Sequence, residues 1–355
     1  MLYICPTQVS IVQEDTMDFS QYVELHRARI YSKICYYIPI REPEEHYLIV
    51  RDYSDRQGKY RRPGLLMLAG ELFGASPEKL ILPAAAMQLS EDWILMHDDF
   101  EDDSSTRRGL PALHKIYGYA QAINGGDAAH IIMWKMLGDY SKEYLSVGFG
   151  LYDKFYEMLT KTVEGQYHDI KFIHTTKRLR GATEELYFKI ASLKTSYYSL
   201  YGPMQLGATA AGAPEEAQNL LQKIGEPAGL AFQIIDDVLD MTSDEKTFGK
   251  QRYGDLYEGK LTLIVLHAYE NASASEKERM DLIFAKERLA KTDDDISFLV
   301  STIEKYDGIG YAKNAAEEYG GNAEEALAGA AGILPENEYS SILHSAITEM
   351  FRRKI

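Results

Sequence analysis

Apolar residues recur along most of this 355-residue chain with the spacing of helices, and strand patterns are scarce. Residues 30–40, rich in Tyr and Ile, fit either element, and we expect a helix there because the neighbouring segments are helical. Prolines fall mainly at expected helix starts: Pro63, Pro77, Pro83, Pro111, Pro214 and Pro227. The pattern predicts an all-α fold, a bundle of long, mostly antiparallel helices around a central cavity.

Two strongly apolar stretches, 87–96 and 229–235, each run into a cluster of aspartates, residues 98–102 and 236–240. Each cluster has aspartates at i, i+1 and i+4, so its first and last members share one face of a helix. A single acidic run is usually a solvated helix face. Here the apolar flanks predict burial, and buried carboxylates need metals or arginines as partners. A carboxylate pair one turn apart suits Mg²⁺, which takes its other ligands from water and substrate phosphates.

Further motifs in ordered spacing make the chain resemble the trans-prenyl diphosphate synthases. The first cluster reads DDxxD and is followed by RRG, and the second reads FQxxDDxxD. The other matches are Gly58-Lys59-Tyr60-Arg61-Arg62-Pro63 (GKxxRP), Gly165-Gln166-Tyr167-His168-Asp169 (GQxxD), Lys194-Thr195, Gly249-Lys250 and Gly259-Lys260. The resemblance spans residues 58–262, and from about residue 265 onward only helical character supports it.

The resemblance implies a head-to-tail prenyltransferase of the short-chain type. An allylic diphosphate would ionise, isopentenyl diphosphate would attack the allylic cation, and loss of a proton would leave a chain five carbons longer. Two or three Mg²⁺ ions, for which Mn²⁺ can substitute, would neutralise the departing diphosphate. Asp98, Asp102 and Asp236 would bind these ions. Asp99 and Asp240 either bind a metal directly or orient neighbouring groups.

The resemblance also implies two anion sites. The allylic diphosphate would be held by Arg107, Lys194 and Lys260, with Lys250 as a further candidate. The diphosphate of isopentenyl diphosphate would be held without metal by Lys59, Arg62 and Arg108. Oxygen dipoles and π electrons around the cation would come from Thr195, Gln233 and Phe232. Gln166 and Asp169 would support the site from another helix, His97 is interpreted as a packing residue, and the released diphosphate is expected to take the proton.

Glu91 is a departure from the family pattern. In relatives a His or Gln commonly stands seven residues before the first aspartate and helps to bind isopentenyl diphosphate, whereas this chain has Glu91. Seven residues are two helical turns, so Glu91 shares a face with Asp98. A carboxylate beside a diphosphate repels it, unless Glu91 pairs instead with Lys59 or Arg62.

Product length is expected to depend on the residues that precede Asp98 on its helix. Ile94 is four residues earlier and shares its face, and Trp93 is five earlier, roughly 7.5 Å deeper along the helix. In archaeal-type enzymes of the family, an aromatic residue at the fifth position with a smaller one at the fourth goes with a geranylgeranyl product. Trp93 with Ile94 fits that pattern, although Trp93 as ordinary core filling fits equally well.

Composition narrows the remaining possibilities. The chain carries 54 acidic and 38 basic residues, a net charge of −16, which makes nucleic acid an unsuitable partner. Cys5 and Cys35 form no disulfide or metal framework, so we expect a reducing, cytoplasmic location. No apolar run is long enough to span a membrane. We expect one domain over residues 1–355, with residues 1–15 as an N-terminal arm, and a homodimer by resemblance. The C-terminal Arg352-Arg353-Lys354 either folds back on the isopentenyl site or is a frayed tail.

Other activities fit the motifs less well. A farnesyl diphosphate synthase is the alternative within the same family. A class I terpene cyclase binds one diphosphate and has no use for GKxxRP or RRG. A head-to-head condensing enzyme usually carries DxxxD motifs, and a regulatory synthase subunit generally lacks one aspartate cluster, whereas this chain has both.

Overall fold

The fold is described from a computed structural model that covers residues 17–243, 252–330 and 332–352. Within these residues the one sheet is a two-stranded hairpin, in which β1 pairs antiparallel with β2. All other regular elements there are helical. In chain order the elements are α1 (Phe19–Tyr37), α2 (Glu44–Asp55), α3 (Arg61–Leu72), α4 (Pro77–Glu101), β1 (Thr106–Arg107), β2 (Leu110–Pro111), α5 (Leu113–Tyr117), α6 (Tyr119–Glu143), α7 (Gly148–Ile170), η1 (Lys171–Thr176), α8 (Glu184–Ile190), η2 (Ala191–Tyr201), α9 (Gly202–Ala211), α10 (Glu215–Thr242), α12 (Gly254–Glu258), α13 (Leu263–Asn271), α14 (Ala274–Phe284), η3 (Arg288–Ala290), α15 (Asp293–Lys305), α16 (Gly308–Ala328) and α17 (Glu338–Phe351).

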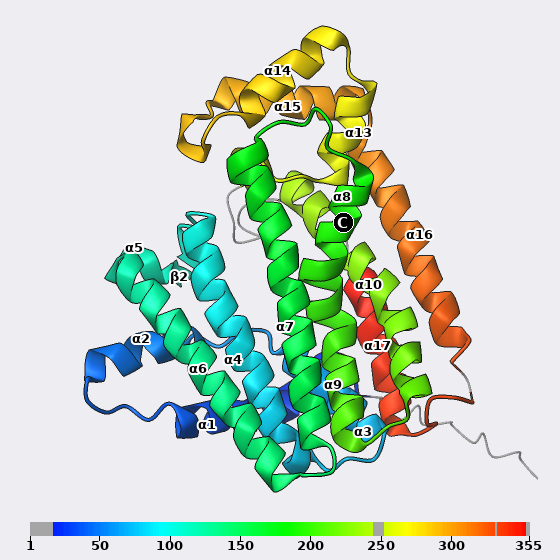
Figure 1. The fold of residues 1–355 in the computed structure, drawn as a ribbon. Coiled ribbons are helices and arrows are strands. Elements are labelled where there is room, and N and C mark those ends of the chain that lie inside the picture. The colour runs from blue at the N-terminus through cyan, green and yellow to red at the C-terminus, as the bar shows by residue number, and fades with distance from the viewer. Residues whose placement is uncertain (1–16, 244–251, 331, 353–355) are drawn as a thin grey trace, which may run out of the picture.

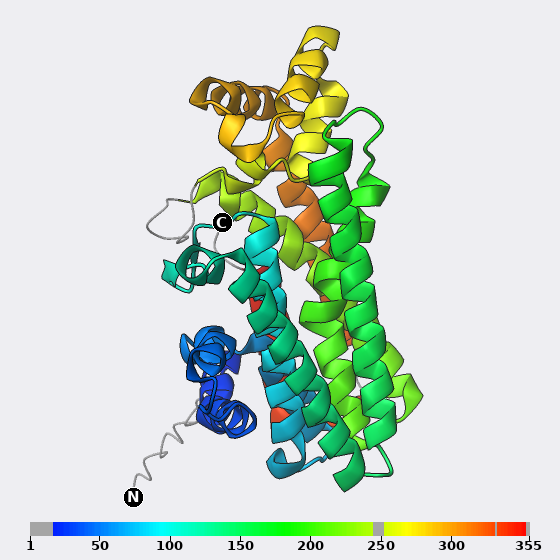
Figure 2. The same ribbon diagram turned by 60° about the vertical axis from the view of Figure 1, so that its left-hand side comes forward.

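Long helices packed side by side form the body of the molecule (Figure 1). Helix α4 packs against α6, α6 against α7, α7 against the π-helix η2, and η2 against α10. Helix α16 covers the other side of α10. Helices α1 and α2 lie to one side, against α3, α4 and α6, as the turned view shows (Figure 2). The helices α13 to α15 form a cap at one end, which is the end that α4 and α10 approach with their C-termini (Figure 1).

Two clusters of buried apolar side chains support this arrangement. The larger cluster joins α1, α3, α4, α6, α7, α9 and α17, and the smaller one joins the cap helices α13 to α15 with α10 and α16. Helix α10 contributes to both clusters, with Ile224 in the first and Ile234 in the second. Each such side chain contributes about 1.5 to 3 kcal/mol when fully buried, so α10 is held along its whole length. The expected all-α fold is confirmed.

The expectations for prolines are partly wrong. Three prolines do lie at or near helix starts: Pro63, Pro77 and Pro214. Pro83 and Pro227, however, lie inside α4 and α10, and Pro111 lies in β2. An interior proline removes one backbone hydrogen bond and costs roughly 3 kcal/mol. Burial of the long apolar faces of α4 and α10 offsets that cost, and a local sequence pattern does not reveal such tertiary support.

The remaining local expectations have mixed outcomes. The helix expected over 30–40 is confirmed as far as Tyr37, where α1 ends. Arg352 pairs with Glu324 of α16 at 2.6 Å. The N-terminal arm, Lys250 and residues 353–355 lie outside the described residues. Among the helices that the structure describes, none is both long and apolar enough to cross a membrane.

Candidate active site

A cavity of about 540 Å³ opens between α4, α7, η2 and α10. It brings together side chains that the sequence separates by more than a hundred residues. Asp98 comes from α4 and Asp236 from α10, and the basic wall is formed by Lys194 of η2 and by Lys260, which follows α12. The cavity therefore joins both aspartate clusters with two of the lysines expected to bind an anion.

The helix that carries Lys194 and Thr195 has local π-helical geometry. Such segments are rare in proteins overall. Where they do occur, they are often at functional sites, because they change the direction in which side chains leave the helix. Two glycines allow the neighbouring helices to approach this segment. A Cβ atom at Gly165 of α7 would lie 2.6 Å from the Lys194 backbone nitrogen, and one at Gly229 of α10 would lie 2.3 Å from Ser196 Oγ. Side chains at these two positions would push α7 and α10 away from η2.

Lys194 is the centre of an acidic network. Its Nζ donates to Asp169 Oδ2 at 2.7 Å and lies 3.6 Å from Asp98 Oδ1. Burial opposes the ammonium charge, but Asp169 and Asp98 together raise the pKa of Lys194 above its ordinary value. Gln166 donates to Asp98 Oδ1 at 3.3 Å and to Glu101 Oε2 at 2.6 Å. The GQxxD and KT motifs thus meet the first aspartate cluster.

Asp102 and Lys260 meet beside the cavity, which Lys260 lines and Asp102 does not. Lys260 Nζ lies 3.5 Å from Asp102 Oδ2 and 2.6 Å from Glu258 Oε2. Burial raises the pKa of Asp102 to about 7, an effect that Lys260 opposes and Asp98 reinforces. Arg288 of η3 pairs with Glu258 at 2.5 Å. Lys260 and Arg288 are thus the cationic partners of the carboxylates at this point.

A hydrogen-bonded chain connects η2 to the second aspartate cluster. Thr195 Oγ1 donates to Gln233 Oε1 at 2.6 Å, and Gln233 Nε2 donates to Asp237 Oδ1 at 2.8 Å. Tyr187 donates to the other oxygen of Asp237, also at 2.8 Å. Burial, reinforced by nearby Asp255, raises the pKa of Asp237 well above its usual range. This chain fixes Thr195 and Gln233 in the cavity wall.

Four residues expected at the metals or the anion clamp are not part of the cavity lining: Asp102, described above, and Asp99, Arg107 and Asp240. Asp99 is fully buried, accepts a hydrogen bond of 2.6 Å from Tyr53, and is bound by Arg107. Arg107 also approaches Asp98, at 3.8 Å. Asp240 is buried and accepts from the backbone nitrogen of Asp255 at 3.2 Å. These contacts orient the ends of α4 and α10.

The residues expected to bind isopentenyl diphosphate lie in different surroundings. Arg62 and Glu91 line the cavity, and Arg62 Nη1 lies 3.1 Å from Glu91 Oε1, so the pairing considered for Glu91 is present. Arg108 is largely buried and pairs with Asp92 at 2.8 Å. Lys59 is exposed in the segment just before α3 and belongs neither to the cavity lining nor to the interior.

Trp93 and Ile94 both line the cavity, below Asp98 on α4. The Trp93 ring packs on two histidines, at centroid distances of 4.5 Å to His130 of α6 and 5.8 Å to His97. His97 also lies 3.6 Å from Asp127 and touches the cavity edge, so it packs as expected but is not remote from the site.

Sequence reasoning missed several contributors. Asp92, Glu101 and Glu258 each hold a basic or amide side chain of the site, and Asp237 orients Gln233. Asp237 and Glu101 lie within the two aspartate clusters, between the first and last aspartates, and that position is the sequence signal for them. Asp92 and Glu258 gave no local signal, because their partners come from distant segments.

Among the residues that the structure describes, no three His, Cys, Asp or Glu side chains are grouped closely enough to hold a metal alone. Asp98 and Asp236 face one cavity from α4 and α10, so each would supply only part of a coordination shell. Such a partial shell fits Mg²⁺, whose remaining ligands are usually waters and substrate phosphate oxygens.

Comparisons with known proteins identify the family. The family description "Polyprenyl synthetase" matches residues 43–303. A geranylgeranyl diphosphate synthase from Methanosarcina mazei is 35% identical over 79% of this chain and 83% of its own. The solved geranylgeranyl pyrophosphate synthetase of Pyrococcus horikoshii aligns with a TM-score of 0.81 at 30% identity, covering 95% of this chain and 98% of that one.

A geranylgeranyl pyrophosphate synthase from Corynebacterium glutamicum, solved with isoprenyl diphosphate and magnesium, has the same fold. Its TM-score is 0.84 at 23% identity, with coverage of 95% of this chain and 100% of that chain. The motifs, the fold and the match over residues 43–303 agree, and this chain belongs to the polyprenyl synthetase family.

Proposed function

We propose that the protein condenses isopentenyl diphosphate with an allylic diphosphate, head to tail, as a short-chain trans-prenyltransferase. The observation that carries the proposal is the single cavity into which Asp98, Asp236, Lys194 and Lys260 all face. Two acidic clusters and two lysines around one space suit an anion accompanied by divalent cations, which is the charge pattern of a departing diphosphate. Family membership supports the same chemistry.

Asp98, Asp102 and Asp236 would hold two or three Mg²⁺ ions, and Mn²⁺ would substitute. Burial and the neighbouring Asp98 charge raise the pKa of Asp102, and a bound cation would relieve both effects. Bound Mg²⁺ supplies positive charge to the developing anion of the leaving group. Asp99 and Asp240 would act from outside the cavity by fixing the helix ends, and Arg107 would orient Asp99 and Asp98. The Corynebacterium glutamicum relative was solved with magnesium, which agrees with this assignment.

The chain's own side chains would guide each bond change. The allylic C–O bond breaks, its electron pair leaves with the diphosphate, and Lys194 and Lys260 neutralise the product anion. The alkene of isopentenyl diphosphate then forms the new C–C bond. The Thr195 hydroxyl donates to the Gln233 amide, which Asp237 holds, and both would present oxygens toward the cation. The proton that is lost goes to the released diphosphate.

We further propose geranylgeranyl diphosphate as the main product, with farnesyl diphosphate as the alternative. Trp93 would close the apolar end of the cavity, because its ring is packed against His130 and His97. Ile94 is smaller and leaves room beside it. The tail would therefore grow along α4 until it meets the Trp93 ring.

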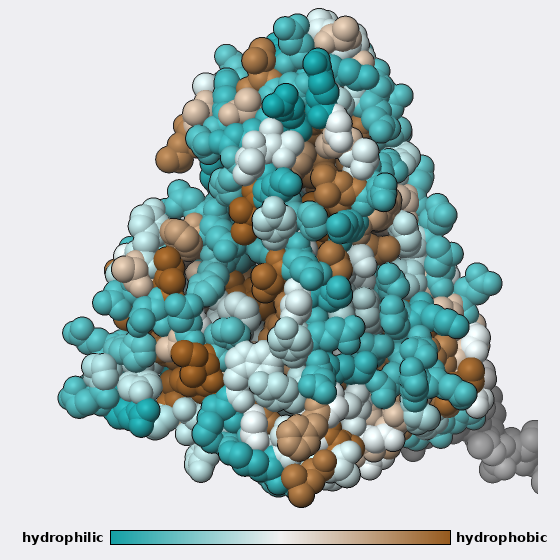
Figure 3. Space-filling model, in the orientation of Figure 1, coloured by the Kyte–Doolittle hydropathy of each residue, from teal (hydrophilic) through white to brown (hydrophobic). Residues whose placement is uncertain are grey.

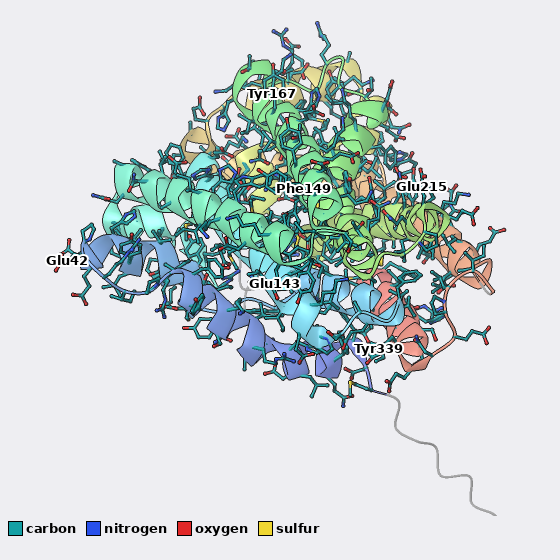
Figure 4. All side chains as sticks on the ribbon, turned by 60° about the horizontal axis from the view of Figure 1, so that its bottom comes forward. Glu42, Glu143, Phe149, Tyr167, Glu215 and Tyr339 are labelled. Carbon is teal, nitrogen blue, oxygen red and sulfur yellow. The ribbon has the colours of Figure 1, made fainter. Side chains whose placement is uncertain are left out.

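A homodimer through α6 and α7 is also proposed. Ile131 of α6 and Phe149 of α7 are 69% and 67% exposed, and Tyr156 and Val163 repeat the Phe149 position at intervals of seven residues. Residues seven apart lie on one helix face, so α7 presents an apolar stripe. Apolar side chains gather over α6 and the lower ends of both helices (Figure 3), and Phe149 lies near the start of α7 (Figure 4). Phe149→Asp should lower the molecular mass measured by light scattering from dimer to monomer.

The two cysteines, which form no disulfide framework, support the expected cytoplasmic location.

A product assay tests the main proposal. The protein is incubated with Mg²⁺ and geranyl or farnesyl diphosphate, with and without isopentenyl diphosphate, and the products are separated by chain length. Elongation that requires isopentenyl diphosphate is the expected result. Cyclic hydrocarbons formed from the allylic diphosphate alone would instead identify a terpene cyclase.

A further inference from the structure

Two adjacent carboxylates, Glu91 and Asp92, face the two arginines of the expected isopentenyl site. Glu91 lies 3.1 Å from Arg62 and 3.7 Å from Arg108, and Asp92 lies 2.8 Å from Arg108. Two positive charges are thus matched by two negative charges of the chain itself. An incoming diphosphate meets arginines that already have anionic partners.

Asp92 belongs to the protein interior. Its side chain has 0% of its surface exposed, and its oxygens accept from Ser54 Oγ at 2.6 Å and Gln88 Nε2 at 3.1 Å as well as from Arg108. Burial raises the pKa of Asp92, and the Arg108 charge opposes that effect. A buried carboxylate that accepts hydrogen bonds from three side chains is held in place, because moving it would leave those donors unsatisfied.

Arg108 is held equally firmly. It donates to the backbone carbonyl of Tyr53 in addition to Asp92. Gly58 makes room for it, because a Cβ atom there would lie 2.8 Å from Arg108 Nη2. The glycine of the GKxxRP motif therefore allows the guanidinium to pass, and Asp92 fixes its orientation.

Glu91 is different, because it is part of the cavity wall. Its side chain is 14% exposed and lines the same cavity as Arg62. Arg62 has further support that does not involve Glu91: Ser199 Oγ accepts from its Nη2 at 2.8 Å, and the Tyr198 ring lies 4.9 Å beneath its guanidinium carbon. Arg62 would keep its place if Glu91 moved aside.

We propose that the two carboxylates have opposite roles in binding isopentenyl diphosphate. Asp92 is a positioning residue that keeps Arg108 oriented, whereas Glu91 is an internal anion that occupies Arg62 until the substrate diphosphate displaces it. A diphosphate binds a guanidinium bidentately and with more charge than one carboxylate, so it wins the exchange at a cost in affinity. This inference rests on the proposed function, since it assigns the second substrate site of the same enzyme.

The test compares Glu91→Gln with Asp92→Asn. Binding of isopentenyl diphosphate is measured by calorimetry without divalent metal, where only the metal-independent site is expected to bind, and KM is measured at saturating allylic diphosphate. Glu91→Gln should lower the dissociation constant about fivefold, as expected for losing a partly exposed ion pair. Asp92→Asn should raise it about thirtyfold, because Arg108 loses its buried partner. The KM for the allylic diphosphate should stay unchanged in both variants.

Two further variants keep the result interpretable. Ser54→Ala removes one hydrogen bond to Asp92 without changing charge, and it should raise the dissociation constant in the same direction but less, even if Asp92→Asn folds poorly. Glu78→Gln is the matched control, because Glu78 also lies on α4 but pairs with Arg29 on the surface. It should change nothing.

Weaker binding by Glu91→Gln would show that Glu91 supports the site and would overturn its assigned role. Unchanged binding in both Asp92→Asn and Ser54→Ala would overturn the role of Asp92. Failure of the proposed function looks different, because the wild-type protein would then form no elongated product with any allylic starter. A wild type that elongates normally while its variants disobey these signs contradicts this inference alone.

Discussion

Replacing Lys194 by methionine should damage stability and catalysis by separable amounts. The change keeps most of the side-chain length and removes the ammonium group. That group lies 2.7 Å from Asp169 and 3.6 Å from Asp98, and it faces the cavity from η2. Without it, Asp169 loses its cationic partner while its own side chain remains only 11% exposed.

The stability loss follows from this geometry. Removing one partner of a fully buried ion pair costs about 3 to 5 kcal/mol. The side chain of Lys194 is 25% exposed, so water already screens part of the interaction. We therefore expect a loss of about 2 kcal/mol, which lowers Tm by roughly 3 °C in a chain of this size.

The catalytic loss has a different origin. Lys194 would neutralise charge that develops on the leaving diphosphate, and removing one such preorganised donor costs about 10²- to 10³-fold in kcat. Asp169 does not share this role, since it acts on Lys194 rather than on the substrate. The double variant Lys194→Met with Asp169→Asn removes the unpaired carboxylate, so it should recover most of the stability and none of the turnover.

The assay measures thermal unfolding and kcat for the wild type, both single variants and the double variant. A control for general damage is Lys161→Met, which removes a partly exposed lysine of α7 whose carboxylate partner among the described residues is Glu164, at 3.3 Å. If Lys194→Met kept more than a tenth of the wild-type kcat, the anion-clamp role would be refuted. If the double variant recovered turnover together with Tm, Lys194 would be a structural residue only.

The remaining predictions concern the metals, the product and pH. Asp98→Ala or Asp236→Ala should lower turnover by about three orders of magnitude, as should chelation of Mg²⁺, because a metal-borne charge is worth several kcal/mol; near-normal turnover of either variant would contradict the assignment. Trp93→Ala should lengthen the products and Ile94→Phe should shorten them, as measured by chromatography of the dephosphorylated prenols. If both variants kept the wild-type product distribution, other residues would set the product length. Burial, partly opposed by Glu258, lowers the pKa of Lys291 from 10.5 to about 8. Between pH 8 and 10.5, Lys291 is therefore protonated in the unfolded chain but largely neutral in the folded protein. The free-energy cost of burying its charge is present below pH 8 and disappears as the pH rises to 10.5. The unfolding free energy of the wild type should rise across this window by about 3 kcal/mol relative to Lys291→Met, and a flat difference would show that Lys291 is not desolvated.

The sequence by itself determined the chemistry of this protein. Aspartates one helical turn apart at the ends of apolar stretches predicted two buried acidic faces, and helical periodicity predicted the all-α fold. These are local properties, since side chains three and four positions apart share a helix face whatever the rest of the molecule does. The family motifs added the reaction, and they also identified Glu91 as a departure from the pattern.

Only the tertiary structure decided which charges meet. Arg62 and Ser199 are 137 positions apart, and no local pattern pairs them. In the folded protein Arg107 pairs with Asp99, and Arg108 pairs with Asp92. Tertiary packing also accommodates Pro83 inside α4. Partner choice depends on how long helices pack against each other, and helix packing is set by the shape of many distant side chains together. That is why the sequence indicates acidic and basic groups of one site, while the fold decides which arginine remains available to a substrate.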